Sequence, residues 1–288
     1  MPPTPSTSCT PQTFRRPDRS TCAVALGFAA MFALGFAPAH AAQCGSTGAG
    51  FAPWLEAYKQ RARGQGISQA TIDRALAGVS YDRSVISRDR SQKSFKLSFE
   101  DFYARRVGSY LISKARGKLK AHAGLISNIE KRYGVPGEIL VSIWGLETNF
   151  GADGSGKYSI IRAIATLAYD CRRSDFFTPH LDAALRIVQK GDMTPEQMRG
   201  GWAGEIGQVQ FLPGSYDKYA VDFDGDGRRD LVRSVPDILA STANFMKGHG
   251  WQRGQPWGPG TANYGVIKDW NKADVYARTI ALMAEKLR

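Results

Sequence analysis

The sequence feature that most constrains the fold is an apolar helical stretch that ends in a carboxylate. Pro136 suits the first turn of a helix, where its missing N–H group costs no hydrogen bond, and Gly151 suits the end of a helix. Between them, Ile139, Ile143 and Glu147 stand at i, i+4 and i+8, on one helical face. The last position of this apolar stripe is therefore a carboxylate.

This position would change the chemistry of Glu147. A carboxyl group among apolar neighbours resists ionisation, because burial disfavours its charged form. Such a group can donate a proton near neutral pH, which a general acid must do. The alternative is a solvated residue, or a local hydrogen-bond acceptor, in the last turn of the helix. Periodicity alone does not choose between the two.

The rest of the chain has the pattern of amphipathic helices separated by polar breaks. We expect helices at 53–63, 68–77, 99–118, 122–133, 160–169, 178–190, 234–247 and 273–286, with Ser68 as one N-cap. Thr194 to Gln197 has the composition of a further helix start. Strand patterns are few and short. The predicted fold class is therefore mainly α (α+β), with a small sheet after Gly151 or near 220–232.

The first 41 residues have the pattern of an export signal. Arg15, Arg16 and Arg19 precede the uncharged apolar run 22–36, and an A-x-A site ends at Ala41. We predict a signal peptide at 1–41, a periplasmic location and no transmembrane span in the mature chain, because the apolar run is short for a span. A retained membrane anchor and a lipoprotein at Cys44 are the alternatives.

Net charge indicates the kind of partner. The chain carries a formal charge of +12. Removing three Arg and one Asp with the signal leaves 12 − 3 + 1 = +10. We expect an exported protein with this charge to meet membrane headgroups or an anionic cell-wall polymer, and not nucleic acid. We also expect a monomer.

Two of the four cysteines, Cys44 and Cys171, lie outside the signal. In an oxidising compartment they would form a disulfide that ties the mature N-terminus to the core, and two separate thiols are the alternative. No cysteine has a metal-ligand spacing and the four histidines are scattered, so we expect no zinc site.

A glycine-rich stretch at 200–216 combines aromatic and amide side chains, among them Gln208 and Gln210. Glycines let the backbone approach a ligand closely, and amides offer both a donor and an acceptor to acetamido groups and hydroxyls. The stretch could therefore bind sugars, with an ordinary turn before a helix as the alternative. Farther on, Trp270, Asn271 and Tyr276 could line a groove, although Asn271 also suits a helix cap.

The segment from Asp222 has the spacing of a calcium loop. Asp222, Asp224 and Asp226 occupy positions 1, 3 and 5, and a glycine follows at position 6. Arg233 stands where a standard loop has its closing glutamate, so Asp237 is the next carboxylate that could close the site. We predict a structural Ca²⁺ site and no organic cofactor. The alternative is a solvated acidic turn.

Taken together, these motifs resemble the lytic murein transglycosylases of the membrane-bound lytic transglycosylase B type, over about 51–288. The most specific parts are 133–136 with 145–151, 207–213, and the acidic loop with Asn244-Phe245 and His249-Gly250-Trp251. The resemblance implies a lysozyme-like helical catalytic core at 133–288, with a calcium-type loop at 222–237 and an N-terminal helical segment at 42–132 packed on that core.

The resemblance also implies roles for individual residues. Glu147 would be the catalytic acid and then base, and Gln210, Asn271 and Tyr276 would face the sugar groove. The metal ligands would be Asp222, Asp224, Asp226, the Arg228 carbonyl and Asp237. Two positions depart from the family pattern: Gln208 replaces a common aromatic, and Gly201 stands where a groove hydroxyl is common. We still assign Gln208 to substrate binding.

The expected function is cleavage of the β-1,4 bond between N-acetylmuramic acid and N-acetylglucosamine in peptidoglycan strands, with a 1,6-anhydro end formed. A glycosidase usually uses two carboxylates. The sequence supplies one well-placed carboxylate, with Glu205 as a weaker second in a glycine-rich turn. A lysozyme-like hydrolase, a non-catalytic cell-wall binding protein and a calcium-dependent interaction module stay open as alternatives.

Overall fold

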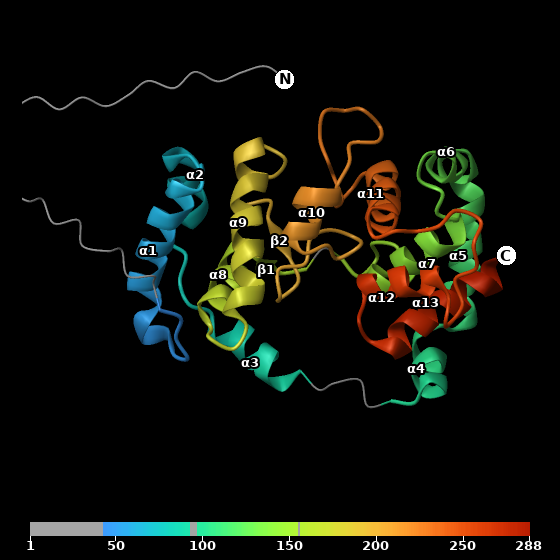
Figure 1. The fold of residues 1–288 in the computed structure, drawn as a ribbon, viewed down its shortest axis with the longest axis horizontal. Coiled ribbons are helices and arrows are strands. Elements are labelled where there is room, and N and C mark those ends of the chain that lie inside the picture. Colours follow the sequence, from blue (N-terminus) through green and yellow to red (C-terminus); the bar gives the residue numbers. More distant parts are fainter. Residues whose placement is uncertain (1–42, 93–96, 155) are drawn as a thin grey trace, which may run out of the picture. The chain divides into compact units, whose positions relative to one another are not determined.

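The computed structural model describes residues 43–92, 97–154 and 156–288 (Figure 1). The predicted signal peptide at 1–41 lies outside the described residues. Within the described ranges, no helix is both long and apolar enough to cross a bilayer.

The fold is mainly helical, as predicted. A short 3₁₀ turn at Gly48–Gly50 precedes the helices, which are α1 Phe51–Gly64, α2 Gln69–Leu76, α3 Arg83–Ser91, α4 Phe99–Arg106, α5 Ser109–Ala121, α6 Ala123–Tyr133, α7 Gly137–Thr148, α8 Ile160–Tyr169, α9 Ser174–Lys190, α10 Pro213–Tyr219, α11 Val235–Gly248, α12 Ala262–Trp270 and α13 Asp274–Leu287. Strand β1, Tyr158–Ser159, pairs antiparallel with β2, Arg199–Gly200. The small sheet thus follows Gly151 as expected, and 220–232 contains no strand.

Several helix boundaries differ from the sequence prediction. The single helix expected at 99–118 is two helices, because the chain leaves the helical conformation at Val107 and Gly108. Helices α3, α10 and α12 were not predicted. They are short, and α3 buries only Val85 and Asp89, so its apolar pattern is weak. Thr194 and Gln197 form the reciprocal hydrogen bonds of a capping box, but the segment remains a turn.

The helices form two groups (Figure 1). In one group, α1 and α3 pack on α8, and α2 packs on α9. In the other, α7 contacts α5, α6, α11 and α13. Helix α10 joins them, because it contacts both α9 and α11. The segment 42–132 therefore contributes to both groups, and the proposed division at residue 133 remains a prediction.

Helix α7 is the centre of the second group. All residues from Ile139 to Leu146 are buried. The helix ends in a reversal at Asn149, Phe150 and Gly151, where φ is 51°, 61° and 81°. Left-handed conformations are unfavourable for residues other than glycine, and they occur where the surroundings enforce them. Here the Lys114 ammonium donates a hydrogen bond to Asn149 Oδ1 at 2.8 Å, which helps to hold the reversal directly after Glu147.

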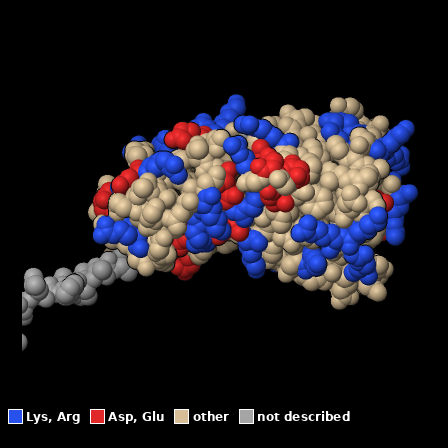
Figure 2. Space-filling view, turned by 90° about the horizontal axis from the view of Figure 1, so that it is seen from above, with Lys and Arg blue, Asp and Glu red and all other residues tan. Residues whose placement is uncertain are grey.

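Basic side chains are prominent at one end of the protein. Helices α5 and α6 carry six lysines and arginines, none of which forms an ion pair with a carboxylate of the described residues: Lys114, Arg116, Lys118, Lys120, Lys131 and Arg132. Figure 2 shows few acidic side chains at this end. This surface therefore suits an anionic partner, as the net charge indicates.

Cys44 and Cys171 form a disulfide with a Cα–Cα distance of 4.9 Å. It joins the start of the described chain to the α8–α9 connection. Next to it, the buried carboxylate of Asp89 is ion-paired with Arg90, Arg172 and Arg173.

Reduction of this disulfide should destabilise the fold. The two cysteines are 127 residues apart, so the bond restricts a long loop of the unfolded chain. We expect the free energy of unfolding to fall by about 2–4 kcal/mol, measured by denaturant unfolding with and without reductant. A Cys44→Ser/Cys171→Ser variant serves as the control, because reductant should not affect it. Equal stability of the oxidised and reduced wild type would contradict this assignment.

Candidate active site

A cleft of about 580 Å³ lies beside the end of α7. Its wall includes residues of α9, α11 and α12 and of the segment 202–215, so both helix groups contribute to it. Glu147 and Gln210 line it together. The volume lies in the range of ordinary ligand sites.

The Glu147 carboxyl is held by two donors from other helices. Its Oε1 accepts a hydrogen bond from Trp270 Nε1 and another from the Tyr276 hydroxyl, each at 2.9 Å. Burial raises the pKa of Glu147, while these two hydrogen bonds and the charge of Arg106 oppose the rise. Because Oε1 already has two donors, the proton of the neutral acid belongs on Oε2. The group thus has the features of a general acid.

Aromatic rings pack around Trp270, one of the two donors to this carboxyl. The Trp270 ring centroid is 5.4 Å from that of Phe211 and 5.0 Å from that of Phe245. The Phe245 ring stacks on His249, with centroids 4.1 Å apart. Aromatic faces exclude water from one side of the cleft and suit the apolar faces of sugar rings.

Gln210 lines the cleft from a tight turn. Ile206 and Phe211 exchange two backbone hydrogen bonds, of 2.7 and 3.0 Å, which close the turn between them. Gln210 has φ of 53°, and its Nε2 donates to the Gly207 carbonyl at 2.7 Å. In the described part of the chain its Oε1 has no hydrogen-bond partner, so this atom is available to a ligand.

Gln208 does not fit its predicted role in substrate binding. Its Oε1 accepts a hydrogen bond from Trp144 Nε1 at 2.7 Å, and its Nε2 donates to the Val232 carbonyl at 2.8 Å. It is not part of the cleft wall. The tight turn gives Gln208 and Gln210 different surroundings, and Gln208 satisfies the buried indole of α7. We therefore assign it a structural role.

Asn271 and Tyr276 meet the site in different ways. Asn271 lines the cleft, and its Oδ1 also accepts the Ala273 N–H at 3.0 Å, before α13. Tyr276 is buried and reaches Glu147 directly rather than through the cleft wall.

Sequence reasoning missed three groups near Glu147. It did not foresee that the Trp270 indole donates to the carboxyl. It gave no weight to Arg106, which donates to the Leu146 carbonyl, and little to Glu205, which lines the same cleft. Burial raises the pKa of Glu205. Only the aromatic and amide composition at 269–276 signalled part of this arrangement.

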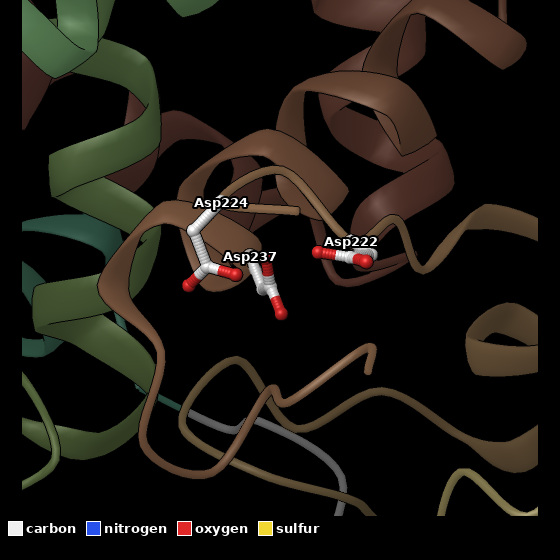
Figure 3. Close-up of side chains that lie close together, drawn as sticks. All are labelled: Asp222, Asp224 and Asp237. Atoms are coloured by element: carbon white, nitrogen blue, oxygen red, sulfur yellow. The ribbon is translucent and has the colours of Figure 1, made fainter. Parts of the chain in front are cut away.

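The acidic loop brings three carboxylates together, those of Asp222, Asp224 and Asp237 (Figure 3). One oxygen from each lies within 4.8 Å of the others. Asp226 is outside this group, and its Oδ1 instead accepts the Arg228 N–H at 2.8 Å. Oxygen-only donors of this charge fit a hard divalent cation such as Ca²⁺. Asp237 stands where the sequence predicts the closing carboxylate, and the predicted part of Asp226 as a ligand stays a prediction.

Comparison with known proteins gives the family. The sequence matches the family described as Transglycosylase SLT domain over residues 50–261. The chain belongs to this family. The membrane-bound lytic murein transglycosylase B of Escherichia coli (strain K12) is 43% identical over 123 residues, which are 42% of this chain and 34% of that protein. The matched part thus spans about a third of the length of that curated relative.

Two solved structures extend the comparison. SltB3 from Pseudomonas aeruginosa, in complex with NAG-anhNAM-pentapeptide, is 33% identical, with a TM-score of 0.76 over 82% of this chain and 79% of that chain. The Escherichia coli lytic transglycosylase Slt35, in complex with calcium, is 23% identical, with a TM-score of 0.73 over 85% of this chain and 96% of that chain. The predicted fold class and family are confirmed: the fold is that of the lysozyme-like lytic transglycosylases.

The raised pKa of Glu147 predicts a pH-dependent cost to stability. Burial places its folded pKa above the ordinary range of a glutamate, so the stability that the neutral acid provides is lost as pH rises through the folded value. Glu147→Gln is neutral throughout, and we expect it to gain stability over the wild type in neutral solution. A pKa that is higher by one in the folded protein lowers the free energy of unfolding by about 1.4 kcal/mol once the group is ionised.

Denaturant unfolding of both proteins at about pH 4 and about pH 8 measures this difference. The control is Glu56→Gln, which removes an exposed carboxylate from α1 and should show no such gain. A Glu147→Gln advantage that grows in acid would contradict the buried setting of this carboxyl.

Proposed function

We propose that this protein is a lytic transglycosylase that cleaves the β-1,4 bond between N-acetylmuramic acid and N-acetylglucosamine in peptidoglycan, leaving a 1,6-anhydro end. The observation that carries the proposal is the Glu147 carboxyl, with one oxygen held by Trp270 and Tyr276 inside an aromatic cleft. The complex of SltB3 with NAG-anhNAM-pentapeptide supports the substrate class.

In the first step, the neutral acid donates its Oε2 proton to the glycosidic oxygen. The bond between that oxygen and the muramic C1 breaks, and positive charge develops at C1. The Gln210 Oε1, which has no partner in the described structure, would accept a hydrogen bond from the acetamido N–H and orient that group toward C1.

In the second step, the Glu147 carboxylate takes the proton of the muramic C6 hydroxyl. The C6 oxygen bonds to C1 and closes the anhydro ring, so no water is consumed. The two hydrogen bonds on Oε1 stabilise the carboxylate between the steps, whereas burial favours the acid before them. One residue can therefore serve as acid and then as base.

A hydrolase acting on the same bond is the second candidate function. The observation that favours it is Glu205, which places another carboxylate in the cleft and could activate a water molecule. The two routes differ in product: hydrolysis gives a reducing muramic end, and the anhydro route gives a product lighter by one water.

Glu147→Gln tests the catalytic assignment. The amide retains an acceptor for Trp270 and Tyr276 but cannot donate an acidic proton, so we expect release of soluble fragments from purified peptidoglycan to fall by about 10²–10⁴-fold. Chromatography with mass spectrometry measures both the rate and the anhydro product. Glu56→Gln, at an exposed position of α1, should keep full activity. An active Glu147→Gln variant would refute the mechanism, and a reducing end would favour the hydrolase.

We also propose export to the periplasm. The segment 1–41 has the pattern of a signal, and the disulfide between Cys44 and Cys171 suits an oxidising compartment. Peptidoglycan is found outside the cytoplasm, so location and substrate agree. The excess of unpaired basic side chains on α5 and α6 suits an anionic wall polymer.

We further propose that Asp222, Asp224 and Asp237 hold a structural Ca²⁺ ion. Asp237 already accepts backbone N–H groups of Phe223 and Asp230 at 2.7 and 2.8 Å, which fixes the loop around it. A bound cation would neutralise carboxylates that otherwise repel each other.

Calcium should therefore raise thermal stability. Binding to the folded state alone adds about 2.7 kcal/mol at a hundredfold excess over Kd, and calorimetry with and without CaCl₂ measures the change in Tm. Asp224→Asn should weaken this response, whereas Asp226→Asn should affect it less, since the Asp226 carboxylate lies outside the group. An unchanged Tm in millimolar calcium, or equal effects of the two variants, would count against these ligands.

A further inference from the structure

Gly201 and Glu205 share one space in the cleft wall. Gly201 N–H donates to the Glu205 carbonyl at 3.0 Å, which closes the turn between them. A Cβ atom on residue 201 would lie within 3.0 Å of Glu205 Oε2, closer than real Cβ contacts. The Glu205 carboxylate therefore fills the space that a side chain at residue 201 would occupy. It fits there because residue 201 is a glycine.

The Glu205 carboxylate is fixed in this space. Its Oε2 accepts the Ala203 N–H at 3.0 Å. The Arg173 guanidinium lines the same cleft and favours the negative charge. These contacts come from the closed turn and from the residue before α9, and they hold the carboxylate in the cleft wall.

We propose that Glu205 is a positioning residue of this active site: an anchored carboxylate, seated in the space left by Gly201, that keeps the catalytic proton on Glu147. The proposal rests on the function proposed above. Glu205 touches neither the glycosidic oxygen nor C1 in this scheme. It acts on the reaction through Glu147.

The physical basis is repulsion between two carboxylates in one cleft. When one is ionised, ionisation of the other becomes less favourable, so a single proton is retained. The hydrogen-bonding groups around each carboxylate determine which of the two retains the proton. Burial raises the pKa of Glu205 as well, but the backbone N–H of Ala203, which can only donate, and the charge of Arg173 oppose that rise and favour the anion. The Tyr276 hydroxyl can also accept, so the Glu147 site tolerates a protonated carboxyl. Burial is the main cause of the raised pKa of Glu147, and the charge of Glu205 adds to the rise.

Other charged groups face the two carboxylates. Burial raises the pKa of both carboxyls; Arg106 at the end of α4 opposes this rise at Glu147, and Arg173, directly before α9, opposes it at Glu205. In the rest of the cleft wall, Asp269 pairs with His249 at 3.3 Å and with Lys272 at 2.5 Å. Burial lowers the pKa of His180, which also lines the wall, to about 4, so this ring is neutral above that pH. Among these groups, only Glu205 adds to the retention of the Glu147 proton.

The pH profile of kcat/KM tests the proposal. The alkaline limb reports loss of the acid proton from the free enzyme. Glu205→Gln removes the neighbouring charge, so the midpoint of this limb should fall by about one pH unit, and activity should decline more in alkaline than in acidic solution. Glu56→Gln is the matched control: it removes one carboxylate charge from an exposed site and should leave the limb in place.

A second variant approaches the same carboxylate from Gly201. The added methyl group of Gly201→Ala would displace Glu205, so the limb should again move to lower pH. In a Glu205→Ala background the same substitution should add no further shift, since no carboxylate remains to be displaced. This cycle separates the effect of the charge from that of the substitution at 201.

Carbon NMR titration of labelled glutamate side chains gives a readout independent of catalysis. The pKa of Glu147 should fall in Glu205→Gln and stay unchanged in Glu56→Gln. An unchanged Glu147 titration or alkaline limb would overturn the proposal, as would a loss of activity that is equal at every pH. An inactive wild type would instead defeat the proposed function, and the titration would still decide the role of Glu205.

Discussion

The site depends on one interaction, the double hydrogen bond to Glu147 Oε1. It joins the last turn of α7 to α12 and α13, which lie more than 120 residues later in the chain. Burying a carboxyl group is unfavourable unless it is hydrogen-bonded. The Trp270 and Tyr276 donors make burial tolerable without supplying a counter-charge that would ionise the acid outright. The protonation of the Glu147 carboxyl therefore depends on how α12 and α13 pack against α7.

The reversal after α7 serves the same end. The three residues that follow Thr148 have positive φ and turn the chain directly after the helix end. Lys114 of α5 holds the first of them, Asn149, through a hydrogen bond. Glu147 therefore stands at an edge, buried enough to keep a proton and open enough to reach a ligand.

Much of this arrangement could be predicted from sequence. The helix that carries Glu147 was predictable, because its apolar periodicity and the Pro and Gly at its two ends indicate the same boundaries. The acidic loop was predictable from the spacing of its aspartates. Amide and aromatic composition located Gln210 and Trp270. What could not be read is which way a side chain points from a tight turn, because that depends on distant partners. Gln208 has the composition of a sugar ligand, yet the indole of Trp144 takes its oxygen. Asp226 has the spacing of a metal ligand, yet its Oδ1 accepts the Arg228 N–H and its carboxylate lies outside the group of Asp222, Asp224 and Asp237.

The contact between the acidic loop and the cleft turn has a mechanical consequence. Gly207 is so close to the Leu231 carbonyl that a Cβ atom would not fit, and Gln208 binds the backbone of both Leu231 and Val232. The end of the acidic loop therefore supports the turn that carries Gln210. If this contact is lost, Gln208 can no longer hold the turn that carries Gln210, and Trp144 loses its hydrogen-bond acceptor. Order in the acidic loop and the position of Gln210 in the cleft therefore depend on each other.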